Sequence, residues 1–392
     1  MSLALAPETR ADWCSGGFGI YVHWPFCKAK CPYCDFNSHV SRTIDHDGWA
    51  EALLAEMAHM RALTGPRRAD TLFFGGGTPS LMRPATVARL IEAADRLWGL
   101  APGAEISLEA NPTSAEAENF RGYAAAGVNR LSLGVQALDD ADLKALGRQH
   151  TAAEAVAAFE TARGVFARVS FDLIYARVGQ TEAAWEAELS RALALAVDHL
   201  SLYQLTVEPG TRFAELHARG RLAVPGQGAA AGLYRLTQEI TQAAGMPAYE
   251  ISNHARPGAE SRHNLIYWRY GDYAGIGPGA HGRVTRGGGR VATETLSDPA
   301  AWMTAVRRAG HGIAVEEALS GADQATEYLL MAMRLAEGAE PARAARLSGA
   351  ALPQARVRAL VADGLLAEEA GRIAATPDGR LVLNAILAEL LA

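Results

Sequence analysis

The chain has 392 residues, of which 49% are hydrophobic and 20% are charged, and its mean hydropathy is close to zero. This composition is typical of a globular protein, and the length allows two to three domains or one large α/β barrel with an appended domain. The formal net charge of −6 excludes a general electrostatic attraction to nucleic acid, so no nucleic-acid partner is expected.

Short apolar runs alternate with amphipathic stretches from Gly19 onward, a pattern of parallel βαβ units. Strands are predicted at Ile20–His23, Thr71–Phe74, Ile106–Glu109, Arg130–Val135, Val169–Tyr175 and Leu200–Val207. Helices are predicted at Trp49–Leu63, Thr86–Trp98, Ser114–Ala126, Ala152–Val165 and Glu182–Ala196. Six such strands are too few for a closed eight-stranded barrel, so the fold class is predicted as α/β with an open, partial (β/α)6 TIM-like barrel.

The first predicted strand is followed by Cys27, Cys31 and Cys34 in a C-x3-C-x2-C pattern. Thiolates ligate iron–sulfur clusters, and a four-iron cluster normally takes four of them. Three thiolates would leave one iron open for chemistry. Cys14 lies outside the pattern and is interpreted as a spare thiol, and four cysteines with this clustering do not indicate a disulfide framework.

Two other interpretations of the cysteines stay open at this point. Cys31 and Cys34 also form a C-x-x-C pair after a strand, which is typical of a dithiol oxidoreductase. The three cysteines together with His23 or His39 would make a zinc site of three thiolates and one imidazole.

Polar or glycine-rich residues stand at the ends of the other predicted strands. Gly75–Ser80 follows the second strand, Glu109 closes the third, Gln136 follows the fourth and Asp172 lies in the fifth. The glycine run lacks both the G-x-G-x-x-G fingerprint of dinucleotide-binding folds and the lysine of a P-loop. In barrels of this kind the chemistry gathers at the carboxyl ends of the strands, so these residues are expected at one rim.

The second half of the chain divides into two predicted parts. A helix at Gly232–Ala244 and a strand at Ala248–Ile251 lead into a loop-rich segment with the runs Arg262–Trp268 and Tyr273–His281. Helices at Thr326–Leu335 and Pro353–Asp363, a small β-wing at 364–377 and a final helix at Gly379–Leu391 predict a winged-helix-like lid or docking module. The predicted domains are a flexible tail (1–17), the partial barrel (18–245), a loop-rich connecting segment (246–322) and a C-terminal helical domain (323–392).

The run Tyr21–Asp35 and the GGGTP segment, with the order of polar residues after them, resemble the radical S-adenosylmethionine (SAM) superfamily. Within it, they resemble the family that holds the oxygen-independent coproporphyrinogen III oxidase and the heme chaperone HemW. The resemblance implies that Cys27, Cys31 and Cys34 hold a [4Fe-4S] cluster whose open iron chelates SAM. It also implies that SAM is contacted by Tyr21, Tyr33, Gly76, Gly77, Thr78, Glu109, Gln136, Arg148 and Asp172.

Three features favour the chaperone over the oxidase. His263–Trp268 matches the HNxxYW motif that marks HemW, Phe36 stands where the oxidase has a further cysteine, and little sequence precedes Tyr21. The resemblance then implies a protein that binds heme and delivers it to an apo-hemoprotein. His263 and His281 are the candidate heme ligands and His39 a weaker third, because imidazole is a common axial ligand of heme iron. The oxidase and the dithiol oxidoreductase remain alternatives, and the sequence leaves open whether the protein is an enzyme.

This chain departs from the family pattern at one loop. Relatives carry Gly-Leu-Pro-Gly-Gln-Thr where this chain has Ala176–Thr181, so that loop is expected to take a different course.

No apolar run approaches the roughly 20 residues that cross a bilayer, and Met1–Gly17 lacks the features of a secretory signal. A cytoplasmic protein is therefore expected. Peripheral membrane association, oligomerisation and the identity of the electron donor are left open.

Overall fold

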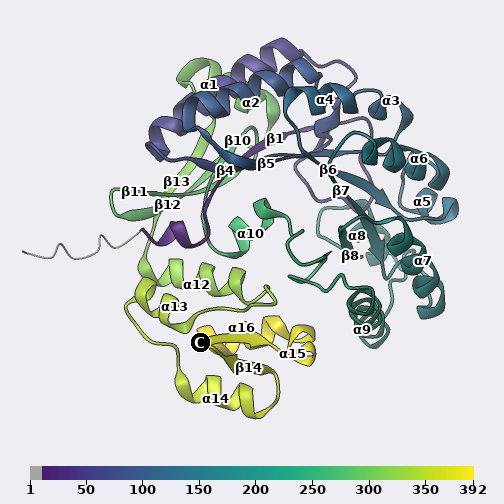
Figure 1. Ribbon diagram of the computed structural model, residues 1–392, viewed down its shortest axis with the longest axis vertical. Helices are drawn as coiled ribbons and strands as arrows, with labels where there is room; N and C mark the ends of the chain where they lie inside the picture. Colours follow the sequence, from purple (N-terminus) through teal and green to yellow (C-terminus); the bar gives the residue numbers. More distant parts are fainter. Residues whose placement is uncertain (1–10) are drawn as a thin grey trace, which may run out of the picture.

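The computed structural model describes residues 11–392, and its main feature is a curved sheet of eleven strands. Its parallel part contains β1 (Phe18–Trp24), β4 (Ala69–Gly76), β5 (Leu100–Ala110), β6 (Arg130–Gln136), β7 (Arg168–Tyr175) and β8 (His199–Gln204). Each strand pairs in parallel with the next. All six predicted strands are present and the predicted open, partial barrel is confirmed (Figure 1).

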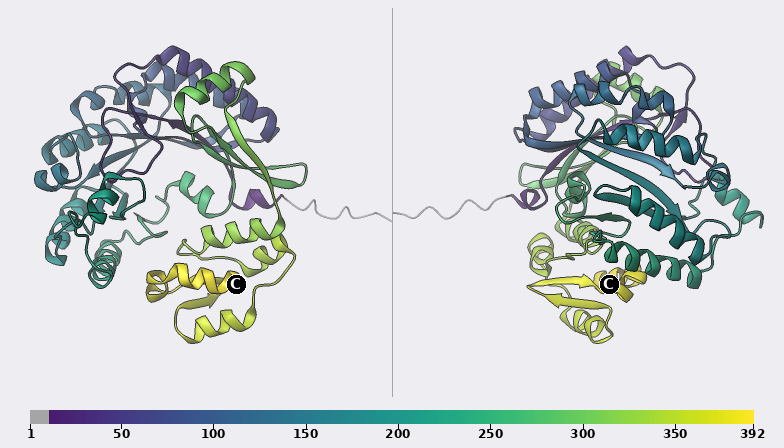
Figure 2. Two further views of the ribbon diagram at one scale, coloured as in Figure 1. Left: turned by 180° about the vertical axis from the view of Figure 1, so that it is seen from behind. Right: turned by 45° about the vertical axis from the view of Figure 1, so that its right-hand side comes forward.

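Helices cover the convex face of this sheet, as Figures 1 and 2 show. They are α1 (His46–Thr64), α2 (Pro84–Trp98), α4 (Phe120–Ala126), α6 (Ala152–Arg163), α7 (Glu182–Leu195) and α9 (Gln227–Ala243). The short helices α3 (Ser114–Ala117), α5 (Asp140–Ala145) and α8 (Arg212–Ala218) lie in the segments that follow β5, β6 and β8, and the Phe213 N–H of α8 donates to the Pro32 carbonyl at 2.8 Å. Local sequence signals set their ends: Asp45 caps α1 through the Gly48 N–H, and Thr151 with Glu154 forms a capping box at α6. The single helix predicted at Ser114–Ala126 is divided into α3 and α4.

Side chains alternate between the two faces of each central strand. In β1, Phe18, Ile20, Val22 and Trp24 are fully buried in the main hydrophobic core under the outer helices. Burying each such side chain contributes roughly 1.5–3 kcal/mol. The intervening residues, Tyr21 among them, face the inside of the barrel together with polar residues of the neighbouring strands. The concave face is therefore available for chemistry.

The segment 246–322 differs from the loop-rich connector that the sequence predicts. It holds β9 (Asn253–Ala255), α10 (Arg262–Trp268), β10 (Asp272–Ile276), β11 (His281–Arg286), β12 (Gly289–Thr295), α11 (Pro299–Ala309) and β13 (Ile313–Leu319). Strand β10 pairs in parallel with the free edge of β1, and β11–β13 continue the sheet in antiparallel order. The strand expected at Ala248–Ile251 is replaced by β9, with Ala248 in an isolated bridge only. These strands are short and rich in glycine and charge, which hides them from a pattern search.

The C-terminal domain has a hydrophobic core of its own. It contains α12 (Gly321–Ala332), α13 (Pro341–Ser348), α14 (Gln354–Ala362), the hairpin of β14 (Leu366–Glu369) and β15 (Arg372–Ala375), α15 (Pro377–Leu381) and α16 (Leu383–Leu391). The helices predicted at Thr326–Leu335 and Pro353–Asp363 correspond to α12 and α14, and the small wing to β14 and β15. The predicted final helix is divided into α15 and α16, and α13 was not predicted. The domain lies across the open side of the barrel, between α9 and the β11–β13 strands (Figures 1 and 2). Arg235–Asp378 and Arg283–Glu327 ion pairs join it to these two sides.

Part of the expected N-terminal tail is packed against this domain. Residues Asp12–Ser15 form the short 3-10 helix η1, and the Asp12 carboxylate pairs with the buried Arg343 guanidinium at 2.8 Å. Residues 1–10 of the expected tail lie outside the described residues. Within residues 11–392, every helix is too short or too polar to span a bilayer.

Candidate functional site

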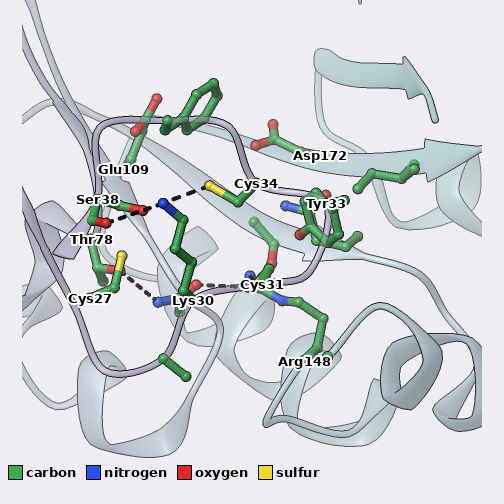
Figure 3. A pocket seen from close by; sticks show the side chains of 18 of the residues that line it. Cys27, Lys30, Cys31, Tyr33, Cys34, Ser38, Thr78, Glu109, Arg148 and Asp172 are labelled. Carbon is green, nitrogen blue, oxygen red and sulfur yellow. Dashed lines mark hydrogen bonds between the residues drawn. The ribbon is translucent and has the colours of Figure 1, made fainter. Parts of the chain in front are cut away.

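The three cysteines of the C-x3-C-x2-C run lie on one loop at the carboxyl end of β1. The loop leaves through β2 (Phe26–Cys27) and returns through β3 (His39–Val40), and these two short strands pair with each other. Cys27, Cys31 and Cys34 all line one cavity of about 400 Å³, as Figure 3 shows. Eight of the nine predicted SAM contacts line the same cavity: Tyr33, Gly76, Gly77, Thr78, Glu109, Gln136, Arg148 and Asp172.

Polar groups reach each of the three sulfur atoms. The Thr78 hydroxyl donates to Cys27 Sγ at 3.3 Å, Arg148 Nη1 donates to Cys31 Sγ at 3.4 Å, and Ser38 Oγ lies 3.9 Å from Cys34 Sγ. Burial raises the pKa of the Cys27 and Cys34 thiols. A reactive dithiol needs the opposite shift, so the site is better suited to thiols that a metal centre deprotonates on binding.

The zinc interpretation requires His23 or His39 as a fourth ligand, and both rings are hydrogen-bonded elsewhere. The His23 ring is engaged through Nδ1 by the Tyr21 hydroxyl and through Nε2 by the Asn37 carbonyl. His39 Nε2 is bonded to the Asn37 side chain. Over residues 11–392, no three His, Cys, Asp or Glu side chains are grouped to bind one metal ion. Three thiols spread around a cavity fit a cluster better than a single ion.

The glycine run after β4 lies so close to β1 that side chains are excluded. A Cβ atom on Gly76, whose φ is +113°, would lie 2.7 Å from the His23 ring. A Cβ atom on Gly77 would lie 2.8 Å from the Phe26 carbonyl oxygen. Only glycine permits this approach, and it leaves the backbone of this segment exposed to a ligand in the cavity. The segment continues into the 3-10 turn η2 (Pro79–Leu81).

Asn111 connects two sides of the cavity, although the sequence analysis did not single it out. Its Nδ2 donates to the Thr78 hydroxyl at 3.3 Å, and its Oδ1 accepts from Arg148 Nη2 at 2.7 Å. Arg148 Nη2 also donates to the Gly134 carbonyl at 2.7 Å. The glycine segment and the arginine beside Cys31 are therefore joined through one amide. Asn111 could have been predicted as a site residue, because it comes two residues after Glu109 at the end of a strand.

Glu109 and Asp172 form an acidic wall opposite the cysteine loop (Figure 3). Burial first, and then the neighbouring Asp172, raises the pKa of Glu109 to about 8. Burial also raises the pKa of Asp172 to about 6, while the Ser132 hydroxyl donates to it at 3.3 Å. A cationic ligand favours the ionised form of carboxyl groups whose pKa is raised in this way, so its binding would restore their negative charge. Tyr203 lines the same wall and was not predicted.

Gln136 and Tyr33 complete the rim of the cavity. Gln136 is the last residue of β6 and has a φ of +75°, a strained conformation for a residue other than glycine. Tyr33 packs against Phe213 with ring centroids 6.2 Å apart. Gln136 was expected just after its strand and is instead its last residue, at the same carboxyl end.

Three predicted site residues lie away from the cavity lining. Tyr21 faces the barrel interior beneath it. His263 is 1% exposed, lies deeper in the barrel, and burial lowers its pKa to about 3. His281 is exposed at the start of β11. The structure thus brings the three cysteines and eight of the nine predicted SAM contacts to one cavity, and neither candidate heme ligand lines it.

Comparisons with known proteins agree with this geometry. Residues 21–192 match the model of the Radical SAM superfamily, and residues 319–382 match that of the HemN C-terminal domain. The heme chaperone HemW of Escherichia coli (strain K12) is 36% identical over 95% of this chain and 98% of its own length. HemW of Mycobacterium tuberculosis (strain H37Rv) is 38% identical over 95% of both.

Two further proteins are similar to this chain, one in sequence and one in fold. Radical S-adenosyl methionine domain-containing protein 1, mitochondrial, of Bos taurus is 42% identical over 80% of this chain and 72% of its own length. The solved structure of coproporphyrinogen III oxidase (HemN) from Escherichia coli, described as a radical SAM enzyme, superimposes with a TM-score of 0.80. That structure covers 96% of this chain and 92% of its own at 23% identity, so it shows a shared fold.

Proposed function

This chain belongs to the radical SAM superfamily and, within it, to the family of the heme chaperone HemW, and we propose that it binds heme and delivers it to an apo-hemoprotein. The observation that carries the proposal is the similarity to proteins named heme chaperone HemW over 95% of the chain, with the HNxxYW motif in place at His263–Trp268.

The cavity residues fit the cofactors that the superfamily implies. Cys27, Cys31 and Cys34 would hold a [4Fe-4S] cluster, and Gly76, Gly77 and Thr78 would receive SAM beside it. Glu109 and Asp172 offer carboxyl groups to the cationic parts of SAM, and Arg148 offers a planar cation to a carboxylate. When bound, the cluster supplies electrons. The role of this chain's own residues is to hold both cofactors in one cavity.

For the heme ligand we propose His281 ahead of His263. A heme iron needs an imidazole nitrogen that is free to coordinate. Both ring nitrogens of His263 are hydrogen-bonded and the side chain is buried. His281 is exposed, and its turn is tied to the cysteine loop because Asn37 Nδ2 donates to the Pro278 carbonyl at 3.0 Å. His39, bonded to the same Asn37 side chain, is the next candidate.

Phe36 supports a binding surface at the mouth of the cavity. It lines the cavity and is 61% exposed, so its ring offers an apolar face to a flat macrocycle near the cluster. At this position the oxidase branch carries a further cysteine. We propose a cytoplasmic location, because the reducing environment there keeps cysteine thiols available to a cluster.

Heme titration of cluster-loaded protein under anaerobic conditions tests the proposal. We expect a Soret shift in the wild type, a heme affinity at least tenfold weaker in His281→Ala, and transfer of the bound heme to a purified apo-hemoprotein. A wild type without a Soret shift would overturn the proposal.

The same protein preparation tests the alternative activity. Coproporphyrinogen III is supplied with SAM and a reductant under anaerobic conditions, and porphyrin products are followed by chromatography. We expect no significant formation of protoporphyrinogen. Its formation at many turnovers per chain would identify an oxidase instead.

A further inference from the structure

Helix α10, which carries the HNxxYW motif, lies inside the barrel rather than on its surface (Figure 1). The buried Glu105 carboxylate of β5 accepts from the backbone N–H of Arg262 at 3.2 Å and of His263 at 3.0 Å. Arg262 Nη1 donates to the Gly103 carbonyl at 2.7 Å. The first turn of α10 is therefore fixed to the parallel sheet.

The His263 ring is locked from both sides. Its Nδ1 is hydrogen-bonded to the Thr71 hydroxyl of β4 at 2.6 Å, and its Nε2 to the Tyr267 hydroxyl at 2.8 Å. A Cβ atom on Gly19 of β1 would lie 3.1 Å from the ring, so a glycine is needed for the ring to approach the strand. The ring lies at the junction of β1, β4 and α10.

Aromatic rings continue from His263 toward the cofactor cavity. The His263 ring stacks on Phe73 with centroids 5.0 Å apart and on Tyr21 at 6.4 Å. Tyr21 and Phe73 themselves stack at 6.3 Å. The interplanar angles of the three pairs are 28°, 29° and 26°, so the rings are nearly parallel. Because protein interiors are closely packed, a displacement of one ring also displaces the other two.

Tyr21 connects this stack to both halves of the cofactor site. Its hydroxyl is hydrogen-bonded to His23 Nδ1 at 3.1 Å, and His23 Nε2 to the Asn37 carbonyl at 2.9 Å, three residues after Cys34. The rings also contact the glycine segment. A Cβ atom on Gly75 would lie 2.8 Å from the Tyr21 ring, just as one on Gly76 would press on His23.

We infer that His263 is a positioning residue for the cluster and SAM site, acting through Tyr21 and His23, and that it does not ligate heme. Thr71 and Tyr267 fix the His263 ring, and Glu105 fixes the His263 backbone N–H. The ring supports Tyr21, and Tyr21 with His23 sets the cysteine loop against Gly75–Gly77. The inference rests on the family's cofactors and is independent of heme delivery. It gives the HNxxYW motif a structural role inside the barrel, and this role is compatible with hydrogen bonds at both ring nitrogens of His263.

The experiment compares His263→Ala with wild type after anaerobic cluster reconstitution. Partners behind a metal site typically change affinity 10- to 100-fold when they are replaced. We expect SAM to bind at least tenfold more weakly and the electron paramagnetic resonance signal of the reduced cluster to change its response to SAM. Heme affinity should be unchanged. His254→Ala is the matched control: His254 is fully buried in β9, is bonded to Gln238, and lies outside the ring stack.

Two variants keep the test decisive. His263→Gln can retain a hydrogen bond to one partner and should recover part of the SAM affinity. If His263→Ala fails to fold, Tyr21→Phe removes only the hydroxyl bond to His23, and it should weaken SAM binding in the same direction. Wild-type SAM affinity and spectra in these variants, or loss of the Soret shift in His263→Ala with SAM binding intact, would overturn the inference. Loss of heme binding in all variants and wild type would instead contradict heme delivery alone.

Discussion

The Thr78 hydroxyl donates a hydrogen bond to the Sγ atom of Cys27 across 3.3 Å. The two residues are 51 positions apart in sequence and come from the segments after β4 and β1. The bond joins the glycine segment that we propose receives SAM to a cysteine that we propose binds the cluster. A hydrogen bond to a ligating sulfur stabilises the added electron of a reduced cluster.

Replacing Thr78 with valine should therefore lower the reduction potential of the cluster while leaving its iron content unchanged. Valine has nearly the same shape but no hydroxyl. Thr78→Ser keeps the donor and should retain the wild-type potential. The potentials are measured by anaerobic redox titration followed by electron paramagnetic resonance. Equal potentials in the valine and serine variants would contradict a role for this bond.

Cluster assembly should depend on Cys27 and not on Cys14. Cys27→Ser removes one of three thiolates, and reconstitution should then give far fewer than about four irons per chain. Cys14 lies in η1, away from the cavity, so Cys14→Ser should load normally. Iron and sulfide analysis with the visible absorption spectrum reports both. A Cys27→Ser protein with a full complement of iron would contradict the ligand assignment.

Gly76→Ala should weaken SAM binding by at least tenfold, since the new methyl group would press on the His23 ring and φ is positive there. The matched control is Gly99→Ala, which carries a similar backbone penalty at φ +72° but has no atom within 4 Å of the new Cβ. The control should lose about 1 kcal/mol of stability and keep its SAM affinity. Equilibrium binding and thermal unfolding separate the two effects. Equal SAM affinities in both variants would refute the steric argument.

SAM affinity should rise with pH between about pH 6 and 8.5, because a cation selects the ionised form of Glu109, whose pKa is raised to about 8 by burial and Asp172. Binding below pH 8 should release a proton, which calorimetry in buffers of different ionisation enthalpy detects. Glu109→Gln should bind SAM more weakly and lose most of this slope. A slope that survives in Glu109→Gln would assign the titration to another group.

Glu56 should dominate the stability of the junction between α1 and the segment 272–312. Its buried carboxylate accepts from the Gly277 N–H at 2.7 Å, the Gly312 N–H at 2.6 Å and the Trp302 indole N–H at 3.0 Å. Glu56→Ala leaves these three donors without an acceptor and should lower the free energy of unfolding by about 3 kcal/mol or more. Urea unfolding of the cluster-free protein measures the loss.

The same carboxylate gives a pH dependence with a definite sign. Burial raises the pKa of Glu56 to about 7, above its usual value, so the folded state binds its proton more tightly than the unfolded state. Its contribution to stability is complete at acid pH below the usual carboxyl range and is lost as pH rises through about 7. Glu56→Gln should remove this decline between pH 5 and 8. An unchanged decline in that variant would contradict the assignment.

Much of the cofactor site was predictable from the sequence because parallel strands deliver their carboxyl ends to one rim. Cys27 and Thr78 come after β1 and β4, and Glu109 lies at the carboxyl end of β5, yet the alternation of short apolar and amphipathic runs is enough to bring them together. The family resemblance supplied the other residues predicted to contact SAM. Tyr21 is the exception, since it is absent from the cavity lining and its hydroxyl is hydrogen-bonded to His23.

The sequence could not place α10, because tertiary contacts stabilise it. The helix has seven residues, too few for a helical period to be recognised, and its first turn is held by Glu105 from 157 positions earlier in the chain. His263 was therefore expected in a loop open to heme, whereas it is buried. The strands β10–β13 were not predicted for the related reason that their partners are distant in the chain or polar.

The loop at Ala176–Thr181 shows another limit of sequence reasoning. Ala176 adopts a φ of +56°, a conformation that favours the glycine found in relatives. Arg177 anchors the loop through ion pairs with Asp142 at 2.7 Å and Glu188 at 2.5 Å. The alanine is held in this conformation at a cost of about 1 kcal/mol of local strain, and a different course of the loop from that of relatives stays a prediction.

Strand β1 has parallel neighbours on both sides, β4 and β10, and it leads directly into the cysteine loop. Its backbone groups are thereby held by two partners, and amide hydrogens there should be among the slowest of the chain to exchange with solvent. The platform beneath the cluster can then outlast the cluster itself. After damage by oxygen, a thiol reductant with fresh iron and sulfide should then restore the loaded form without unfolding and refolding.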